Sequence, residues 1–429
     1  MNLKRVNEDF VQFVWKFSLF SKENLILPTG ERIQIVYPGT QNFNGGPDFF
    51  NAKIYIGETL WVGNVEIHLS IKDWHQHQHA LDAAYNNIIL HVVYAEENEP
   101  IKLQNKRHVP SLSIGKYIYP KTLEKYEQLQ SHESLFIPCQ RLIIQVEPFT
   151  YTEFYETLLF ERLERKVLDI ENDLRFVQGD MDAAFNLNLF KYFGAPLNKG
   201  NFELLARSFT RSQLHKQQVS IIQLESFLFG LADLLQGQDP YALSLQAEFD
   251  YTKSLFKLQN YCKGSQWHFA GVRPQNFPTI RIAQLAALLF KNPRMFTQII
   301  EESSLKTIKN KFELEVSAYW TSHYSFNKVS KASSKRLSSS FIDKLLINLI
   351  VPMLFFYGKY IGEERYIERA VRFLNETKAE QNQLIKGFKA LSAPCANAFD
   401  SQALIELKNS YCIPKKCLSC RIGYQLLKQ

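Results

Sequence analysis

The sequence predicts an α/β domain that is followed by a larger all-helical domain. In residues 1–120, segments that alternate apolar and polar residues lie between an amphipathic helix and a nearly continuous apolar strand. From about residue 145 onward, apolar residues recur at helical spacing, as in residues 151–174. A chain of 429 residues, of which 45% are hydrophobic, can bury two or three domain cores. We therefore expect domains at 1–120 and 145–410, with a tail at 411–429 that packs on the helical domain.

Six elements are expected in the N-terminal domain, in the order α-β-β-β-α-β. Asn7 has a suitable side chain for the N-cap of the first helix, and Gly57 with Glu58 suits a tight turn between the second and third strands. Asp73 is expected to cap the second helix, with Gln76 as its capping-box partner. The last strand is almost wholly apolar, as in a sheet interior. The six segments are 7–20, 32–39, 52–57, 60–71, 73–86 and 88–95.

Two carboxylates are expected to meet on the strands of this domain. Side chains alternate between the two faces of a strand, so Glu66 and His68 share the face opposite Val65 and Ile67. Asp48 stands at the start of the strand that is expected to pair with this one. Paired carboxylates suit a hard divalent cation that retains water ligands. The sequence therefore predicts a site for Mg²⁺ or Mn²⁺.

The same residues resemble the PD-(D/E)xK nuclease-like superfamily. That superfamily has an acid on its first helix, a Pro-Asp pair, a strand with an acid-x-lysine triplet, and the αβββαβ order of restriction endonucleases. By this resemblance, Asp48 and Glu66 would be the metal-binding acids, and Glu8 would be the acid of the first helix. Tyr85 or Asp82 would occupy the variable polar position of the second helix. The resemblance implies a metal-dependent nuclease that hydrolyses DNA.

One departure from the superfamily pattern concerns the triplet, which reads Glu66-Ile67-His68 and has histidine in place of lysine. The lysine of such enzymes positions or activates the attacking water. His68 could act as a base or ligate a metal, Lys53 or Lys72 could supply an ammonium from another position, or catalysis could have been lost. The alternatives to a nuclease are therefore a non-catalytic nucleic-acid-binding or scaffold protein and a metal-dependent hydrolase of a small phosphorylated substrate.

Over nearly its whole length, the chain also resembles an uncharacterised bacterial family known only as a domain of unknown function. The segments that carry this resemblance are GPDFFNAKI, GNVEIHLSIKDWHQHQH, ILHVV, RPQNFPTIRIAQLA and YCIPKKCLSCRIG. This family implies no activity, so the functional prediction depends on the residues themselves.

A run of histidines follows the triplet. On the predicted second helix, His75 and His79 are four residues apart and share a face, and Asp82 lies three residues further on. Such a set could hold Zn²⁺, Mn²⁺ or Fe²⁺, or could contact a substrate phosphate. His77 is expected to point elsewhere. The alternative is a solvated helix start, and we expect His79 rather than His75 to belong to the site.

Three of the six cysteines lie in the last 18 residues, at Cys412, Cys417 and Cys420. Tetrahedral zinc and iron–sulfur clusters usually take four protein ligands. Cys395 is the first choice for the fourth ligand, and Cys139 is the second. Some nuclease-like relatives carry an iron–sulfur staple with a different cysteine pattern. The sequence thus predicts zinc or an iron–sulfur cluster without deciding between them, and the alternative is a set of reduced thiols.

Two arginines flank a rigid turn in the helical domain. Pro274 and Pro278 bracket this turn, which opens a helix near Thr279, with Arg273 and Arg281 on either side. Helix starts beside arginines can bind the phosphates of a nucleic acid backbone. The alternative is a structural turn in which the arginines satisfy protein groups.

The composition predicts a soluble, cytoplasmic protein with no membrane partner. The N-terminal residues MNLKRVNEDF lack the apolar stretch of a secretory signal. The most apolar run, 345–358, is shorter than the roughly 20 residues of a membrane span. Asn348 and Pro352 within this run favour a buried helix. The net charge of +7 is compatible with nucleic acid as a partner but does not require it, and the oligomeric state is not indicated.

Overall fold

The computed structural model describes residues 6–428 apart from positions 98, 132–134, 195 and 259–261. It divides the chain into two compact units. Unit 1 consists of Met1–Phe154, Gly387–Ala393 and Glu406–Gln429, and unit 2 consists of Tyr155–Lys386 and Pro394–Ile405. Unit 2 therefore interrupts unit 1 in the sequence.

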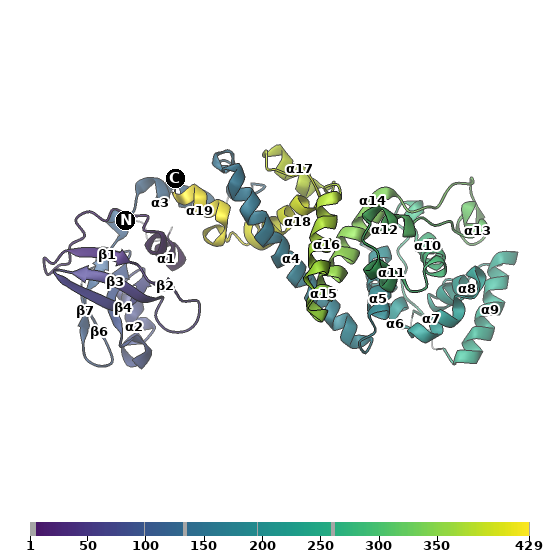
Figure 1. Ribbon diagram of the computed structural model, residues 1–429, viewed down its shortest axis with the longest axis horizontal. Coiled ribbons are helices and arrows are strands. Elements are labelled where there is room, and N and C mark those ends of the chain that lie inside the picture. Colours follow the sequence, from purple (N-terminus) through teal and green to yellow (C-terminus); the bar gives the residue numbers. More distant parts are fainter. Residues whose placement is uncertain (1–5, 98, 132–134, 195, 259–261, 429) are drawn as a thin grey trace. The chain divides into compact units, whose positions relative to one another are not determined.

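Unit 1 contains a six-stranded mixed sheet (Figure 1). The strand order is β1-β3-β4-β5-β8, and β2 pairs with β3. β1, β3 and β4 are antiparallel neighbours, whereas β5 runs parallel to both β4 and β8. The sheet strands are β1 Ile33–Tyr37, β2 Thr40–Gln41, β3 Phe49–Ile56, β4 Thr59–His68, β5 Ile88–Val93 and β8 Ser111–Ser113. A second, two-stranded sheet joins β6 Ile101–Lys102 to β7 His108–Val109.

The β3–β4 hairpin places the two predicted acids side by side. Its tight turn contains Gly57 at φ +59°, as expected. On either side of the turn, Ile56 of β3 pairs with Thr59 of β4. The register shifts between Phe49 and Ala52, and Phe49 then pairs with Val65. Asp48, which precedes β3, therefore lies next to Glu66, which follows Val65 on β4.

The helix α1, Glu8–Phe17, begins where the sequence predicts. The side chain of Asn7 accepts a hydrogen bond from Phe10 N at 3.0 Å, which satisfies an amide that the first turn leaves free. Phe10, Val14 and Trp15 of this helix are fully buried in the core of unit 1. One face of α1 is thereby fixed, and the start of the helix remains half-exposed.

The second helix differs from the prediction. α2 covers only Ile71–Gln76, and its N-cap is Ser70 rather than Asp73. Asp73 is the partner in this capping box, because its carboxylate accepts from Ser70 N at 2.9 Å. The helix ends early because Gln78 adopts a left-handed conformation with φ +57°. Two short 3₁₀ turns follow, η2 His79–Leu81 and η3 Ala83–Tyr85.

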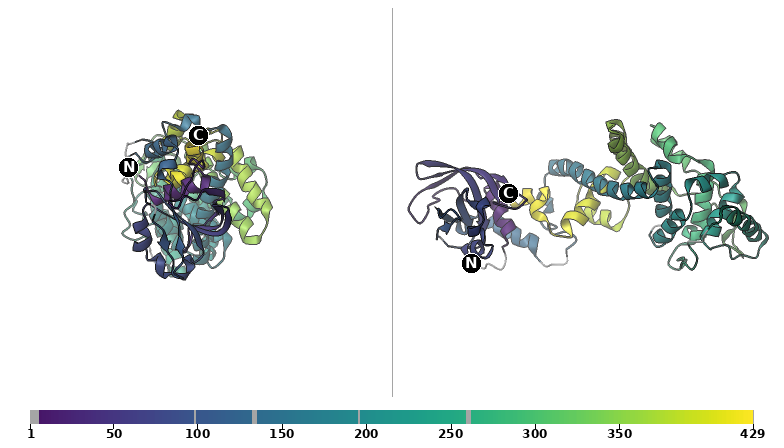
Figure 2. Two further views of the ribbon diagram at one scale, coloured as in Figure 1. Left: turned by 90° about the vertical axis from the view of Figure 1, so that its left-hand side faces the viewer. Right: turned by 90° about the horizontal axis from the view of Figure 1, so that it is seen from below.

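The C-terminal segment belongs to unit 1, although we expected it to pack on the helical domain. The Tyr424 ring lies 4.3 Å from the Phe17 ring of α1, and Figure 2 shows this yellow segment beside the purple helix. Thr122 Oγ1 donates to Leu427 O at 3.2 Å. The elements involved are α3 Pro120–Gln130, η4 Gly115–Tyr117, η5 Ile143–Gln145, η8 Leu407–Cys412, η9 Cys417–Ser419 and α19 Arg421–Lys428.

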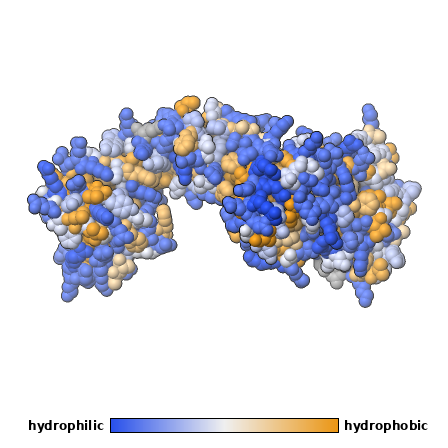
Figure 3. All heavy atoms as spheres, in the orientation of Figure 1, coloured by the Kyte–Doolittle hydropathy of each residue, from blue (hydrophilic) through white to orange (hydrophobic). Residues whose placement is uncertain are grey.

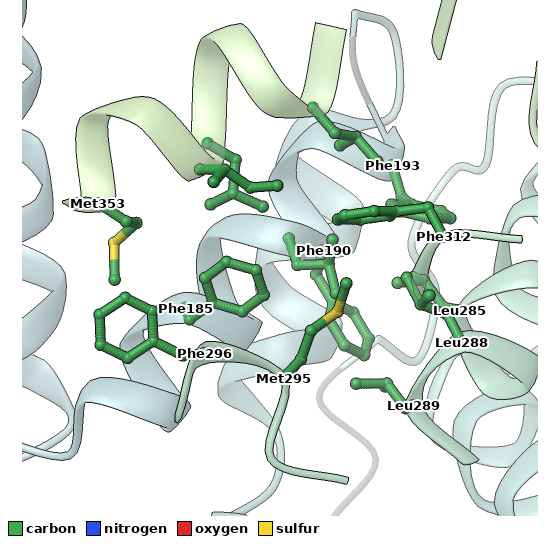
Figure 4. Close-up of a cluster of buried hydrophobic side chains, with 14 of the residues drawn as sticks. Phe185, Phe190, Phe193, Leu285, Leu288, Leu289, Met295, Phe296, Phe312 and Met353 are labelled. Atoms are coloured by element: carbon green, nitrogen blue, oxygen red, sulfur yellow. The ribbon is translucent and has the colours of Figure 1, made fainter. Parts of the chain in front are cut away.

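Most of residues 148–406 form helices around an aromatic core. In Figure 4 the rings of Phe185 and Phe296 face each other, 5.8 Å apart, beside Met353. An α/β part followed by a mainly helical part is therefore confirmed. The elements are α4 Pro148–Phe176, α5 Met181–Gly194, α6 Lys199–Arg207, α7 Arg211–Gln217, α8 Ile221–Leu231, α9 Pro240–Phe256, η6 Pro274–Asn276, α10 Pro278–Lys291, α11 Met295–Glu301, α12 Leu305–Lys311, α13 Ala318–Thr321, β9 His323–Ser325, β10 Lys328–Val329, α14 Ser339–Leu345, η7 Leu346–Ile350, α15 Val351–Ile361, α16 Glu364–Glu376, α17 Gln383–Ala390 and α18 Ala398–Glu406.

The apolar run 345–358 forms the buried helix that the sequence predicts. By length and composition alone, the helical stretch Ser339–Ile361 could cross a membrane, but 61% of its most apolar part is buried inside the protein. On the face drawn in Figure 3, apolar side chains form small separate groups among hydrophilic ones.

Candidate active site

Three carboxylates converge in unit 1 from three different elements. Asp48 Oδ2 accepts a hydrogen bond from Ile67 N at 2.9 Å, and Glu66 Oε2 accepts from Asp48 N at 3.0 Å. Gln12 Nε2, on α1, donates to Asp48 Oδ1 at 2.9 Å and to Glu8 Oε1 at 3.4 Å. The hairpin thus holds two of the acids directly, and α1 supplies the third through the amide of Gln12.

Simultaneous ionisation of Glu8, Asp48 and Glu66 is unfavourable. Burial is the main cause of a raised pKa at Glu8, Asp48 and Glu66. Repulsion adds to it, because Asp48 and Glu8 raise the pKa of Glu66 and Glu8 raises that of Asp48. The hydrogen bond from the Ile67 amide acts in the opposite direction at Asp48. Crowded carboxylates need protons or a cation for neutrality, and their hard oxygen atoms suit a divalent cation.

Three histidines adjoin the acids. His68 Nε2 lies 3.7 Å and His79 Nε2 lies 3.5 Å from Glu66 Oε1. His68, His77 and His79 each have one ring nitrogen that lies within 4.8 Å of the corresponding nitrogens of the other two, so the three could share a metal ion. The expectation that His77 points elsewhere is wrong, because α2 ends at the residue before it and helical spacing no longer applies. We call Glu8, Asp48, Glu66 and these three histidines the acid–histidine site.

Two buried side chains, His91 and Ser111, form a hydrogen-bonded series with the ring nitrogen of His68 that faces away from the acids. His68 Nδ1 lies 2.9 Å from His91 Nε2, and His91 Nδ1 lies 3.1 Å from Ser111 Oγ. Burial lowers the pKa of His68 strongly and that of His91 to about 3, so both rings are neutral. This series fixes the ring of His68 with Nε2 toward Glu66. Sequence reasoning missed His91, whose only signal was a single polar residue within an apolar strand.

Aromatic rings line the histidine side of the site. The Tyr85 ring lies 4.1 Å from the His79 ring, and the Trp74 ring lies 5.3 Å from it. Burial, together with the charges of Glu66 and Asp48, raises the pKa of Tyr85 to about 12. The tyrosine therefore remains a neutral hydroxyl beside the acids.

Four other residues considered in the sequence are exposed, and one of them, Asp82, acts on the cluster through its charge, which opposes the lowering of the pKa of His79 by burial. Asp82 caps the turn η3, where Oδ1 accepts from Ala84 N at 2.8 Å. His75 and Lys72 are exposed on α2. Lys53 is exposed on β3 and pairs with Val62. Val62 precedes Glu66 by four residues, a distance of about 13 Å along a strand.

The two predicted phosphate-binding arginines lie in unit 2. Arg281 is buried, and its guanidinium donates to Asn276 Oδ1 at 2.7 Å and to Gln284 Oε1 at 2.9 Å. It also lies 3.8 Å from the centre of the Phe341 ring, and burial lowers its pKa to about 10. Arg273 is exposed at the start of η6. The donors of Arg281 are thus engaged by protein groups.

Residues 8–383 match the model of a protein family that is described as "Protein of unknown function (DUF2851)". The chain belongs to this family. The matched range contains the whole acid–histidine site and His91, and it ends before Cys395. Comparisons with curated proteins and with solved structures found no significant match.

Proposed function

We propose that this DUF2851 protein is a metal-dependent nuclease that hydrolyses phosphodiester bonds in DNA at the acid–histidine site. The observation that carries the proposal is the convergence of Glu8, Asp48 and Glu66 in a setting that raises the pKa of all three. Such an arrangement is unfavourable for a metal-free fold, and perturbed carboxylates of this kind cluster at functional sites.

The architecture of unit 1 supports a restriction-endonuclease-like fold. A helix precedes an antiparallel β1-β3-β4 set, a short helix follows, and β5 returns parallel to β4. The acids occupy the places that the superfamily pattern assigns: α1, the residue before β3, and the last part of β4.

Asp48 and Glu66 would hold the metal, with Glu8 completing the acidic side. A bound divalent cation would lower the pKa of a coordinated water and neutralise charge on the phosphate. His68 is neutral and points Nε2 at Glu66, so it can offer a lone pair to the metal or accept a hydrogen bond from a metal-bound water. Nitrogen ligands shift the preference from Mg²⁺ toward Mn²⁺.

The first experiment measures nicking of supercoiled plasmid by purified protein with Mn²⁺ or Mg²⁺. Asp48→Ala and Glu66→Ala should abolish nicking, and Asp48→Asn, which keeps the shape of the side chain, should abolish it as well. Lys53→Ala is the matched control and should retain activity, because this side chain is exposed away from the acids. Loss of activity in Lys53→Ala would show that Lys53 supplies the missing ammonium.

The second candidate is a non-catalytic nucleic-acid-binding or scaffold protein. The observation that favours it is the neutral, buried His68 at the position where the superfamily has a cation. His68→Lys separates the possibilities. Retained or higher nicking indicates that the residue positions water, whereas weaker Mn²⁺ binding by calorimetry indicates a ligand, because an ammonium has no lone pair. Wild-type protein that neither binds Mn²⁺ nor cuts single- or double-stranded substrates would favour the scaffold.

A further inference from the structure

The three histidines of the acid–histidine site form a compact cluster beside the acids. Among the residues that the structure describes, His68, His77 and His79 are the one group of three or more possible metal ligands close enough to share an ion. Their ring centres lie 5.3 Å apart in every pair. Zinc favours imidazole nitrogen, so this cluster suits a different metal from the one that the oxygen-rich acids suit.

The local backbone explains how histidines at alternate positions converge. The helix α2 ends just before His77, and His79 begins the next turn, η2. Between them, Gln78 adopts a left-handed conformation with φ +57°, which is unfavourable for a residue other than glycine. The chain reverses there, and both rings come to lie beside His68 at the end of β4.

Hydrogen bonds hold the ring of His68 in the orientation that a metal ligand requires. His68 Nδ1 lies 2.9 Å from His91 Nε2, and His91 Nδ1 lies 3.1 Å from Ser111 Oγ. With a proton on each Nδ1, His68 donates to His91, and His91 donates to Ser111. The Nε2 atom of His68, on the side of Glu66, then has its lone pair available. Metal-binding histidines are ordinarily fixed in this way through their second ring nitrogen.

Glu66 can supply a fourth ligand atom. Its Oε1 lies 3.5 Å from His79 Nε2 and 3.7 Å from His68 Nε2. Its other oxygen, Oε2, accepts from Asp48 N at 3.0 Å. With zinc–ligand bonds of about 2.0–2.1 Å, two neighbouring corners of a tetrahedron are about 3.3–3.4 Å apart, close to both observed separations. His77 is exposed, so its ring can rotate to complete the set without disturbing a packed core.

The cysteines are the alternative position for zinc. Cys395 belongs to unit 2, whereas Cys139, Cys412, Cys417 and Cys420 belong to unit 1. Within the described part of the chain, no three of these thiols meet the distance that the three histidines meet. A cysteine-bound metal therefore stays a prediction from the sequence, and the test below distinguishes it from a histidine-bound one.

We propose that the three histidines, with Glu66 Oε1 as the fourth ligand, bind a zinc ion next to the acids. Four protein ligands make a closed site, in which zinc orients side chains and does not react with a substrate. The ion holds Glu66 with Oε2 toward Asp48 and ties the turn between α2 and η2 to β4. This zinc site shares Glu66 with the proposed nuclease site, but zinc binding does not depend on nuclease activity.

The test uses full-length protein that is stripped of metal with a chelator and then titrated with Zn²⁺ in a calorimeter. His77→Ala should weaken the binding of one equivalent at least about tenfold, without changing the melting temperature of the metal-free protein, because His77 is exposed. His75→Ala is the matched control, since His75 is also exposed but lies outside the cluster, and it should bind zinc as wild type does. Equal zinc affinity and stoichiometry in wild type and His77→Ala would overturn the proposal.

Cobalt identifies the ligands. The difference spectrum between Co²⁺-loaded wild type and Co²⁺-loaded His77→Ala isolates the ion at the histidines, whatever the cysteines bind. This difference should contain the visible bands of a four-coordinate ion and no thiolate charge-transfer bands. A difference spectrum without visible bands, or with thiolate bands, would show that the histidines do not hold the ion.

Asp48→Asn separates the failure of this inference from the failure of the proposed nuclease. The variant should lose plasmid nicking but keep a zinc affinity near that of wild type, because Asp48 is not a zinc ligand. Zinc binding at the histidines without nicking by wild type would refute the nuclease and leave the zinc site standing. Nicking by a wild-type protein whose histidines bind no zinc would refute the zinc site alone.

Discussion

Replacing Glu66 by glutamine should stabilise the metal-free protein at neutral and higher pH. A carboxyl group whose pKa is raised by folding binds its proton more tightly in the folded state. Stability is therefore greatest below the unfolded value of 4.5 and falls as pH rises toward the higher folded pKa. Glutamine can still accept the hydrogen bond from Asp48 N and carries no charge. Wild type and variant should therefore be similar in stability near pH 4 and differ at pH 8.

The size of this effect follows from the burial of Glu66. One pKa unit of difference between the folded and unfolded states corresponds to about 1.4 kcal/mol. Glu66 is only 4% exposed, so solvent does not screen its charge, and its shift exceeds one unit. Allowing for relaxation of the protein around the charge, we expect a gain of about 1.5–3 kcal/mol at pH 8. This gain corresponds to roughly 3–10 °C in melting temperature.

The assay is thermal unfolding of wild type and Glu66→Gln, each with a chelator and with Mn²⁺. A cation bound only by the folded state stabilises it by about 4.1 kcal/mol at a thousand times its Kd, which exceeds the expected gain of the variant. Wild type should gain this stability and the variant should not, so the order of the two melting temperatures should reverse when Mn²⁺ is added. A variant that is less stable than wild type without metal, or that gains equally from Mn²⁺, would refute the reasoning.

Three further predictions concern stability. Glu225 is fully buried, and burial is the main cause that raises its pKa to about 7. The free energy of unfolding measured with urea should therefore fall as pH rises from 4.5 to 7, and Glu225→Gln should weaken this pH dependence. Gly63→Ala should cost about 1–3 kcal/mol in the same assay, because its Cβ would lie 2.4 Å from Ile89 Cγ2. Asp173→Asn should cost about 3 kcal/mol, because Lys191 Nζ, 2.7 Å from the buried carboxylate, would lose the nearer of its two carboxylate partners and keep only Glu203 at 3.5 Å; a change below 0.5 kcal/mol would contradict this.

Alternation of residues along the strands predicts much of the first unit. The turn at Gly57 and the shared face of Glu66 and His68 are local features, so periodicity and turn chemistry suffice to predict them. The place of Asp48 beside Glu66 also followed, because a hairpin with a tight turn limits the register. The bulge near Asn51, at φ +58°, was not predictable from the pattern.

The features that sequence reasoning missed depend on tertiary contacts or on competing local signals. Ser70 and Asp73 are both good cap residues, and only the backbone shows that the first one caps the helix. His91 looked like part of an apolar strand, because its partner Ser111 lies 20 residues further on.

The interruption of unit 1 by unit 2 has a consequence for synthesis on the ribosome. The hydrogen bond from Thr122 to Leu427 joins residues 305 positions apart. At a translation rate of roughly 5–20 residues per second, about 15–60 s pass between the synthesis of Thr122 and that of Leu427 in the last helix of unit 1. During that interval the apolar face of α1 that receives Tyr424 is open to chaperones. A ribosome that stalls before residue 406 therefore yields a nascent domain with exposed phenylalanines, which is the kind of surface that cellular quality control recognises.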